Sequence, residues 1–474
     1  MAHANDNRKS EAKVGAEMPA LFAGSAIADI TPAMGIQIDG DIGRLRPVEE
    51  IRDPLFARAL VLESDGRRCC LLSLDLCGVS TELTQRIRRE ASQRFGIGSD
   101  AVMVHAVQNH AAPALSVSDY MLSEGFPLPD ELWFLRGGDK RYDEGAVRDI
   151  LAAIGQACEA LQPVRLRAAR GVDGRVAFNR RFVMRDGTVT THPRTCDPDI
   201  LYCEGPIDPE VSLVTLEGKE HTVAALLHHT CHPCHGYPER WISAGWPGAW
   251  ARMMDKQLGP GCVSLVLNGA CGNIHHANHL DRTQRDDYTE MARKLAETAR
   301  EALTRMEQPD QTPLRAVSRS VSIPRRKLAP DEVAAAKALL AEHPKPMWLD
   351  AERTAIEWDW VYALALVDLA ATCEREPDYS YEVQVIRIGD VAVLALDGEP
   401  FVEAQLAIKL SSPAKYTLVA HNSNGSAGYV PTREAFARGG YETRTATWSQ
   451  LVTEALDMIQ CEALKLISGL FPER

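Results

Sequence analysis

Histidine side chains are concentrated in one part of this chain. Eight of the fourteen histidines fall between residues 221 and 279, a stretch that also carries glycines where backbone can approach a ligand closely. Neutral imidazole binds zinc-like metals and serves as a general base. The cluster therefore predicts an active site, although any one of these histidines alone could be a surface or core residue. The eight are His221, His228, His229, His232, His235, His275, His276 and His279.

Two histidines and one glutamate follow predicted buried strands. His110 comes after a predicted strand at 101–108, His232 after one at 222–228, and Glu399 after the apolar run that begins at Gly389. Strands of one sheet deliver their ends to one edge, so we expect these three side chains to converge. Two imidazoles and a carboxylate match a catalytic zinc site with an open position. Two alternatives stay open, because His110 could cap a turn and Glu399 could cap the helix that follows it.

Cysteine usage suggests a second kind of metal site. Cys231 and Cys234 form a lone CxxC beside the histidines, and Cys262 and Cys271 could in principle complete a structural zinc site. The twelve cysteines are scattered, which does not indicate a disulfide framework in a chain of this length. A reducing cytoplasm is the expected compartment.

The elements that would position these residues alternate along the chain. Two apolar runs joined by Asp65-Gly66 predict a β-hairpin. Ser80 and Gly96 bound a predicted helix as its N-cap and its C-terminal glycine. Buried strands and helices continue to alternate to the end of the chain, which predicts an α/β fold.

Two segments are rich in aromatic residues. Residues 114–140 are irregular and have the length of a pocket wall or lid. Residues 348–373 have helical periodicity, and we expect their aromatic residues to form a packed helical pair rather than a binding site. The aromatic residues are Tyr120, Phe126, Trp133 and Phe134 in the first segment and Trp358, Trp360 and Tyr362 in the second.

Composition limits the partners. The chain has 474 residues, 45% of them hydrophobic, and a net charge of −13, which argues against a nucleic acid or an anionic membrane surface as main partner. We find no apolar run long enough to span a membrane. Residues 1–20 are polar, lack the apolar core of a secretory signal and are expected to be disordered. A small-molecule substrate is the expected partner, and a homo-oligomer stays open.

An ordered series of motifs resembles a known family. The series runs AGSAIADITP, VQNHAAP, FNRR, LLHHTCHP, ISAGWPG, LNGACGNIHH, LDGEPF and GYVPTREAFARGGYE, over roughly residues 20–460. It resembles the catalytic domain of the neutral (alkaline, non-lysosomal) ceramidases and their bacterial relatives. The resemblance implies mixed β-sheets flanked by helices in a single catalytic domain at 21–474, without the family's C-terminal immunoglobulin-like domain.

The resemblance also implies roles for particular residues. Tyr441 corresponds to the tyrosine that assists at the carbonyl oxygen, and Arg180 lies in a segment that often contacts substrate. His275 and His276 are the candidates for substrate contact or a general acid. Tyr429 and Tyr441 could instead be core aromatics. The implied Zn²⁺ ligands are His110, His232, Glu399 and Tyr429.

Several positions depart from the family pattern. Gln108 replaces the first histidine of the His-x-His segment, Gly245 replaces a frequent aspartate, and Gly269 aligns with the nucleophilic serine. We expect Gly269 to leave room beside the metal, so that a metal-bound water attacks in place of the serine. The Cys271 thiol is the alternative nucleophile.

These departures argue against ceramide as the substrate. The sequence therefore predicts a zinc-dependent hydrolase that attacks an amide, ester or lactone carbonyl of a polar substrate. Two alternatives stay open. One is a metal enzyme that acts on a sugar or sugar acid, and the other is a non-enzymatic binding module with a relic metal site.

Overall fold

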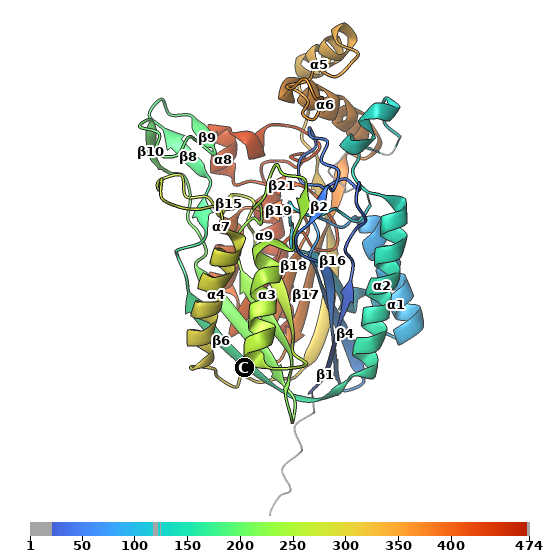
Figure 1. Ribbon diagram of the computed structural model, residues 1–474, viewed down its shortest axis with the longest axis vertical. Coiled ribbons are helices and arrows are strands. Elements are labelled where there is room, and N and C mark those ends of the chain that lie inside the picture. Colours follow the sequence, from blue (N-terminus) through green and yellow to red (C-terminus); the bar gives the residue numbers. More distant parts are fainter. Residues whose placement is uncertain (1–20, 117–121, 124, 472–474) are drawn as a thin grey trace, which may run out of the picture.

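The computed structural model describes residues 21–116, 122–123 and 125–471 (Figure 1). The predictions for residues 1–20 and for Tyr120 lie outside the described residues. The largest element is an eight-stranded mixed sheet, in which the β12–β14 and β4–β5 pairs are parallel and the other pairs antiparallel. Its strands, in spatial order, are β14 (Val263–Asn268), β12 (Thr222–His229), β11 (Glu210–Glu217), β6 (Gln162–Val172), β1 (Leu21–Asp29), β3 (Phe56–Ser64), β4 (Arg67–Leu74) and β5 (Val102–Ala106).

A second, four-stranded sheet packs against the first. Apolar residues of both sheets share one buried cluster, which includes Leu72, Leu265 and Val393. Burial of this apolar area is the main stabilising contribution to the arrangement. In spatial order the strands are β16 (Leu314–Pro324), β17 (Asp378–Ile388), β18 (Val391–Leu396) and β20 (Tyr416–Ala420).

Helices cover the outer faces of the two sheets. Of the first two helices, the second packs on the strands β1 and β3 and the first beside it and against β5. Two more pack beside β6, β11 and β14, and two cover the second sheet. Two others project beyond the sheets at the top of Figure 1, and a short helix lies at the upper left. In the same order these are α1 (Thr81–Phe95) and α2 (Lys140–Glu159), α3 (Gly245–Leu258) and α4 (Tyr288–Leu303), α7 (Val402–Ser411) and α9 (Ala455–Leu470), α5 (Pro330–Glu342) and α6 (Trp358–Arg375), and α8 (Arg433–Arg438).

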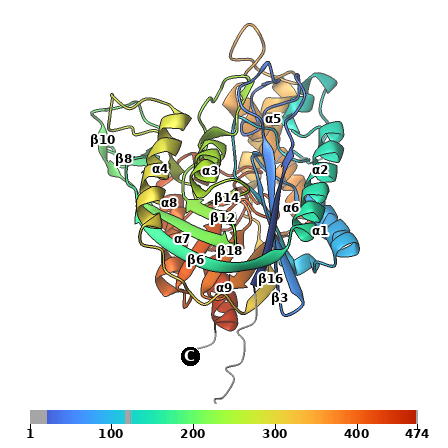
Figure 2. The same cartoon turned by 60° about the horizontal axis from the view of Figure 1, so that its bottom comes forward.

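The eight-stranded sheet bends, so that its two ends approach each other. Strand β6 curves across the molecule between the two arms of the sheet (Figure 2). The Ser73 hydroxyl of β4 donates a hydrogen bond to the Val266 carbonyl of β14 over 2.8 Å. The Asn268 N–H, at the end of β14, donates to Nε2 of His105 in β5 over 3.0 Å. The bend therefore brings the ends of β5 and β12 together, although five strands separate them in the sheet order.

Short elements lie mainly at the end of the molecule where these strands finish. Within the described residues, three of them are two-stranded pairs and one is a small three-stranded sheet. Three more are 3-10 turns, of which the first precedes β5 at the opposite end and the second is kinked at Leu132. The pairs are β2 (Glu50–Ile51) with β13 (Trp241–Ile242), β7 (Phe178–Asn179) with β15 (Ile274–His275), and β19 (Glu399–Pro400) with β21 (Tyr429–Val430). The small sheet comprises β10 (Ile200–Cys203), β8 (Arg181–Met184) and β9 (Val189–Thr191), and the turns are Ser99–Ala101, Asp130–Leu135 and Tyr441–Thr443.

Local sequence signals account for several boundaries. Asp65 and Gly66 both have positive φ in the β3–β4 hairpin, as a tight primed turn requires. Ser80 caps α1 by accepting a hydrogen bond from the Leu83 N–H, and Gly96 ends the helix in the left-handed region. These predictions, and the α/β class, are confirmed.

The predicted helix at 348–373 starts ten residues late. Helix α6 begins at Trp358 because the preceding residues form a loop closed by Asp350. The Asp350 carboxylate accepts hydrogen bonds from the N–H groups of Thr354 and Ala355 over 2.8 Å each. An aspartate that binds nearby backbone in this way competes with helix formation.

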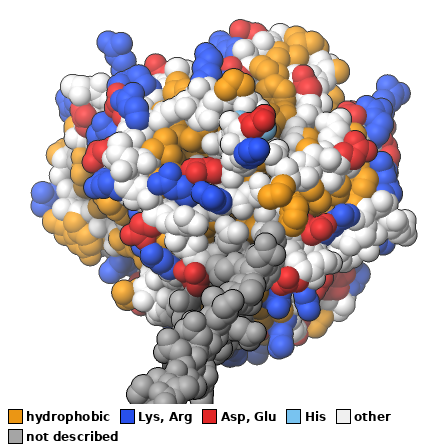
Figure 3. All heavy atoms as spheres, turned by 90° about the horizontal axis from the view of Figure 1, so that it is seen from below, with side chains coloured by type: hydrophobic (Ala, Val, Ile, Leu, Met, Phe, Trp, Pro, Cys, Tyr) orange, Lys and Arg blue, Asp and Glu red, His pale blue; other side chains and the backbone are white. Residues whose placement is uncertain are grey.

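The opposite end of the molecule carries charges of both signs. Figure 3 shows this face, with Lys and Arg side chains interspersed among Asp and Glu and scattered hydrophobic side chains. Within the described residues, no helix has both the length and the apolar character needed to cross a bilayer.

Candidate active site

Three predicted site residues meet just beyond the strand ends. His110 follows β5, His232 follows β12, and Glu399 opens β19, which comes directly after β18. Their convergence is confirmed, but the expectation that one sheet supplies all three is wrong. Glu399 comes from the second sheet, and the bend in the first sheet brings the two histidines together.

His232 is held in one orientation by its backbone neighbours. Its Nδ1 lies 2.6 Å from the Cys271 carbonyl oxygen and 3.2 Å from that of Ile274. A carbonyl only accepts, so Nδ1 carries the ring proton and Nε2 presents a lone pair. This orientation is the one that metal-binding imidazoles adopt. Nε2 lies 3.1 Å from Glu399 Oε2, and the His232 ring is 5.6 Å from that of His110, centre to centre.

Three buried polar atoms in this group have no hydrogen-bond partner. They are Nε2 of His110, Nε2 of His232 and Oε2 of Glu399. Buried polar atoms are nearly always paired, so three such atoms together need an explanation. Burial, reinforced by the nearby His232, lowers the pKa of His110 well below its usual value. The imidazole is therefore neutral at neutral pH and can act as a ligand, and this donor set fits a metal ion.

Cys234 joins the two histidines. One donor atom each from His110, His232 and Cys234 lie within 4.8 Å of one another. The alternative of a four-cysteine zinc site is wrong, because the described groups that could hold a metal contain this one cysteine alone. Cys231 is instead buried in an apolar cluster that packs under α3.

The two tyrosines lie beside this group on the second sheet's side. In the parallel β19–β21 pair, Tyr429 stands opposite Glu399. The ring of Tyr441 is 5.6 Å from that of Tyr429, and Tyr441 is 37% exposed and lines the cavity described below. Burial, followed by the charge of Glu399, raises the pKa of Tyr429 well above its usual value, while Arg180 acts in the opposite direction.

Arg180 is anchored in a buried charge network. Its Nε donates to Glu442 over 2.8 Å, its Nη2 donates to the Gly272 carbonyl over 2.7 Å, and its guanidinium lies 5.3 Å from the centre of the Tyr429 ring. Glu442 also accepts a hydrogen bond from Arg181 over 2.6 Å. Burial alone would raise the pKa of Glu442, but the two arginines lower it below its usual value, so the carboxylate stays charged. Sequence reasoning missed Glu442, although it directly follows Tyr441.

A second group of imidazoles lies beside the first. His276 Nε2 is 3.0 Å from Asp286 Oδ1, and His235 stacks on His276 with ring centres 3.6 Å apart. Donor atoms of His235, His276 and Asp286 also lie within 4.8 Å of one another. His275 differs, because its Nδ1 accepts the Ala277 N–H over 3.0 Å. Burial lowers the pKa of His275 well below its usual value. The neutral ring therefore carries its proton on Nε2 and acts as a hydrogen-bond donor.

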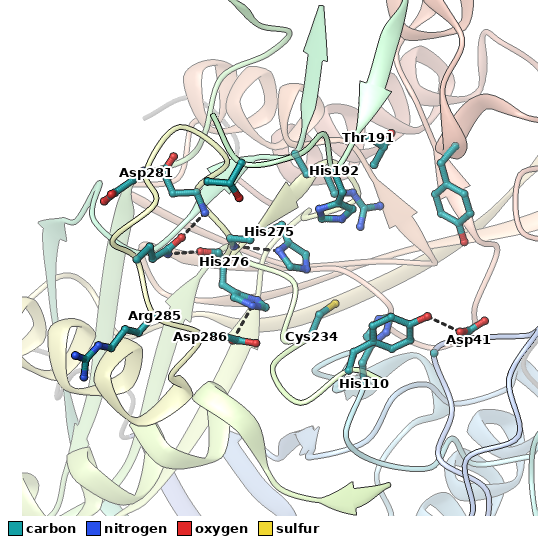
Figure 4. A pocket seen from close by; sticks show the side chains of 18 of the residues that line it. Asp41, His110, Thr191, His192, Cys234, His275, His276, Asp281, Arg285 and Asp286 are labelled. Carbon is teal, nitrogen blue, oxygen red and sulfur yellow. Dashed lines mark hydrogen bonds and ion pairs between the residues drawn. The ribbon is translucent and has the colours of Figure 1, made fainter. Parts of the chain in front are cut away.

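Several of these residues line a cavity of about 650 Å³ (Figure 4). They are His110, Arg180, Cys234, His275, His276, Asp286, Tyr429 and Tyr441, whereas His232, Glu399 and His235 are not among the lining residues. The cavity wall combines charged and polar side chains with the aromatic rings of Tyr237, Trp358, Tyr429 and Tyr441. Because Trp358 lines it, the prediction that the aromatic residues of 348–373 only pack together is wrong for this residue, whereas Trp360 and Tyr362 are buried as expected. Among the lining residues are also His192, Thr191, Asp41, Tyr237 and Arg285, which sequence reasoning missed.

Two further expectations concern the turn after β14. A β-carbon on Gly269 would lie 2.1 Å from Thr230 Oγ1 and 2.5 Å from Gln405 Oε1, so Gly269 faces the core. The expectation that it leaves room beside the metal is wrong, because a side chain at this position would meet Thr230 and Gln405, and none of these three residues lines the cavity. Cys271 is fully buried, its Sγ lies 3.4 Å from His421 Nε2, and burial raises the pKa of its thiol well above the usual value.

Comparison with known proteins identifies the fold. No family model matches the sequence, and no curated protein matches it. Neutral ceramidase from Pseudomonas aeruginosa matches the structure with a TM-score of 0.72 and 18% sequence identity, over 96% of this chain and 75% of the ceramidase chain. A ceramidase complexed with C2 matches with a TM-score of 0.70 and 17% identity, over 96% of this chain and 76% of that one. The resemblance to neutral ceramidases is thus confirmed at the level of the fold.

Proposed function

We propose that this protein is a zinc-dependent hydrolase that cleaves an amide, ester or lactone bond of a polar substrate. One observation carries the proposal. Unpartnered, buried donor atoms of His110, His232 and Glu399 converge beside a cavity lined by charged, polar and aromatic side chains. The ceramidase fold supports a hydrolytic reaction.

The donor set suits zinc. His110, His232 and Glu399 would hold the ion, and Tyr429, opposite Glu399, is the proposed fourth ligand. Imidazole nitrogen with a single carboxylate is a common set for zinc at catalytic sites. When bound, zinc supplies Lewis-acid chemistry, which polarises a carbonyl group and acidifies water.

The surrounding side chains would orient the substrate and move protons. His275 presents an N–H that can donate to a carbonyl oxygen as negative charge develops on it, and Tyr441 presents a hydroxyl for the same purpose. His276 is paired with Asp286 at Nε2, while its Nδ1 has no partner, so this ring can accept and return a proton. Arg180 positions Tyr429 and the turn at Gly272.

The cavity wall supports a polar substrate. Side chains around it include His192, Thr191, Asp41 and Arg285, beside aromatic rings such as that of Trp358. A long acyl chain placed against Asp41 and Arg285 would remove water from these charged groups, which is costly.

Metal analysis and a substrate screen test the proposal. The purified chain should carry about one zinc, and His232→Ala should lose it while the circular dichroism spectrum is kept. His343→Ala, at the end of α5 and outside the cavity, is the matched control and should keep the metal. Full metal content in His232→Ala would refute the assignment, and a chain without zinc would favour a relic binding module.

One observation favours a second candidate, a metal enzyme that acts on a sugar or sugar acid. Trp358 and Tyr441 lie beside the cavity, both are about one-third exposed, and their rings are 6.1 Å apart. Exposed aromatic faces of this kind can stack on a sugar ring. A panel of N-acyl amides, lactones and glycosides would separate the two candidates.

A further inference from the structure

Beside the proposed metal ligands lies a donor that the ceramidase resemblance does not supply. Cys234 lines the cavity and belongs to the close group formed with His110 and His232. We infer that the Cys234 thiolate is a ligand of the ion, so that the centre is built on two histidines and a cysteine, with Glu399 beside them. This inference rests on the proposed function, because it needs an ion at this site.

Backbone contacts hold the three donors together. The segment His232-Pro233-Cys234 follows β12, and its Pro233 carbonyl accepts the backbone N–H of His110 over 3.1 Å. This hydrogen bond fixes His110 beside the two residues that flank Pro233. In Figure 4, Cys234 lies between His110 and His276, with its sulfur in the cavity.

The distances favour Cys234 as a member of the central set. Its donor atom and those of both histidines are mutually within 4.8 Å. Glu399 lies 3.1 Å from His232 but is outside this set. The Nε2 atoms of both histidines are buried and unpartnered, as expected if they face an ion shared with the sulfur.

The other half of the CxxC makes the contrast clear. Cys231 is fully buried among apolar side chains, and its Sγ contacts the carbonyl oxygens of Val176 and of His232. It therefore has partners and faces away from the cavity. Cys231 is thus a core residue and Cys234 is the proposed ligand, so the site needs no second cysteine pair.

Ligation requires loss of the thiol proton. Burial raises the pKa of the Cys234 thiol to about 12, so without an ion this group is protonated at neutral pH. On binding, the S–H bond breaks, a bond from sulfur to the metal forms, and one proton passes to solvent. A coordinating thiol is deprotonated in this way even when its free pKa is high. Thiolate also favours zinc over magnesium or calcium.

Cobalt substitution tests the inference directly. Cobalt(II) bound to thiolate gives a near-ultraviolet charge-transfer band that nitrogen and oxygen ligands do not give. One equivalent of Co²⁺ added to the metal-free full-length chain should produce this band. Cys234→Ser should lose the band, while Cys231→Ala, the matched control from the same motif, should keep it.

Each outcome decides between the two proposals. If Co²⁺ binds stoichiometrically without the band, or if the band persists in Cys234→Ser, the cysteine is not a ligand, while the proposed metal centre stands. If no Co²⁺ binds at all, both fail.

A second measurement needs no variant. Iodoacetamide at alkaline pH, which offsets the raised pKa of the thiol, should modify Cys234 in the metal-free chain because the residue lines the cavity. One equivalent of Zn²⁺ should block the modification at that peptide. Equal labelling with and without stoichiometrically bound zinc would overturn the inference. Tyr429→Phe should keep the cobalt band. Loss of the band in this variant would show that Tyr429, and not Cys234, is the ligand that the ion requires.

Discussion

Acid should destabilise this protein through histidines that are buried without charge. His105 in β5 and His228 in β12 are both fully buried. In each case burial is the main cause that lowers the pKa, to about 3. The unfolded chain has an ordinary histidine pKa of about 6.5. Between these values the unfolded state binds more protons than the folded state, so stability is complete above about pH 6.5 and falls as the pH drops through that window.

The magnitude follows from the difference between the two pKa values. One pH unit below the unfolded pKa, each of these two histidines costs about 1.4 kcal/mol, and two units below it each costs about 2.7 kcal/mol. Together they remove about 5 kcal/mol near pH 4.5, a large part of the 5–15 kcal/mol that typically separates folded from unfolded domains.

Urea unfolding at a series of pH values provides the assay. His228→Gln should reduce the slope of unfolding free energy against pH by about 1.4 kcal/mol per unit between pH 5.5 and 4, whatever it does to stability at pH 8. His343→Gln is the control, since the side chain of this residue is 42% exposed, and it should leave the slope unchanged. An unchanged slope in His228→Gln would show that the ring is already protonated in the folded protein and would refute the reasoning.

Further predictions concern the cavity and its supports. Cys271→Ala should keep activity within about tenfold, or ~1.4 kcal/mol in the barrier, because the thiol is buried away from the cavity, while Glu399→Ala and His110→Ala should abolish it in a steady-state assay. Sphingosine release from ceramide should be undetectable, and turnover on the order of 1 s⁻¹ would show that the cavity accepts an acyl chain. Glu442→Gln should lower the unfolding free energy by about 3 kcal/mol in urea titrations, because it leaves Arg180 without its buried carboxylate; a loss within experimental error would contradict the role given to that network.

Short-range patterns were sufficient for much of the fold. The Asp65-Gly66 turn, the Ser80 cap and the apolar strands each depend on neighbouring residues, so the sequence alone predicts them. The sequence also predicts that His110 and His232 follow strands, because the end of a strand depends on the residues next to it.

Contacts between distant segments could not be predicted from local motifs. The bend at β6 depends on packing between arms of a sheet, and no local motif predicts that β14 reaches β4. Gly269 and Cys234 show the same limit on a smaller scale, because side-chain direction reverses within a residue or two of a turn. The role of Glu442 could be recognised only from the structure, because it depends on ion pairs with Arg180 and Arg181 from a distant part of the chain.

The origin of the donors in separate segments has a consequence for folding. His110 and His232 come from opposite arms of the bent sheet, while Glu399 comes from the second sheet. An ion bound by all three would act as a cross-link that closes two very long loops, and such links restrict the unfolded chain most. The apolar clusters can keep the two sheets packed without the ion. An ion that binds only the folded chain stabilises it further, so the melting temperature should rise with free zinc concentration even in a variant that has lost catalysis.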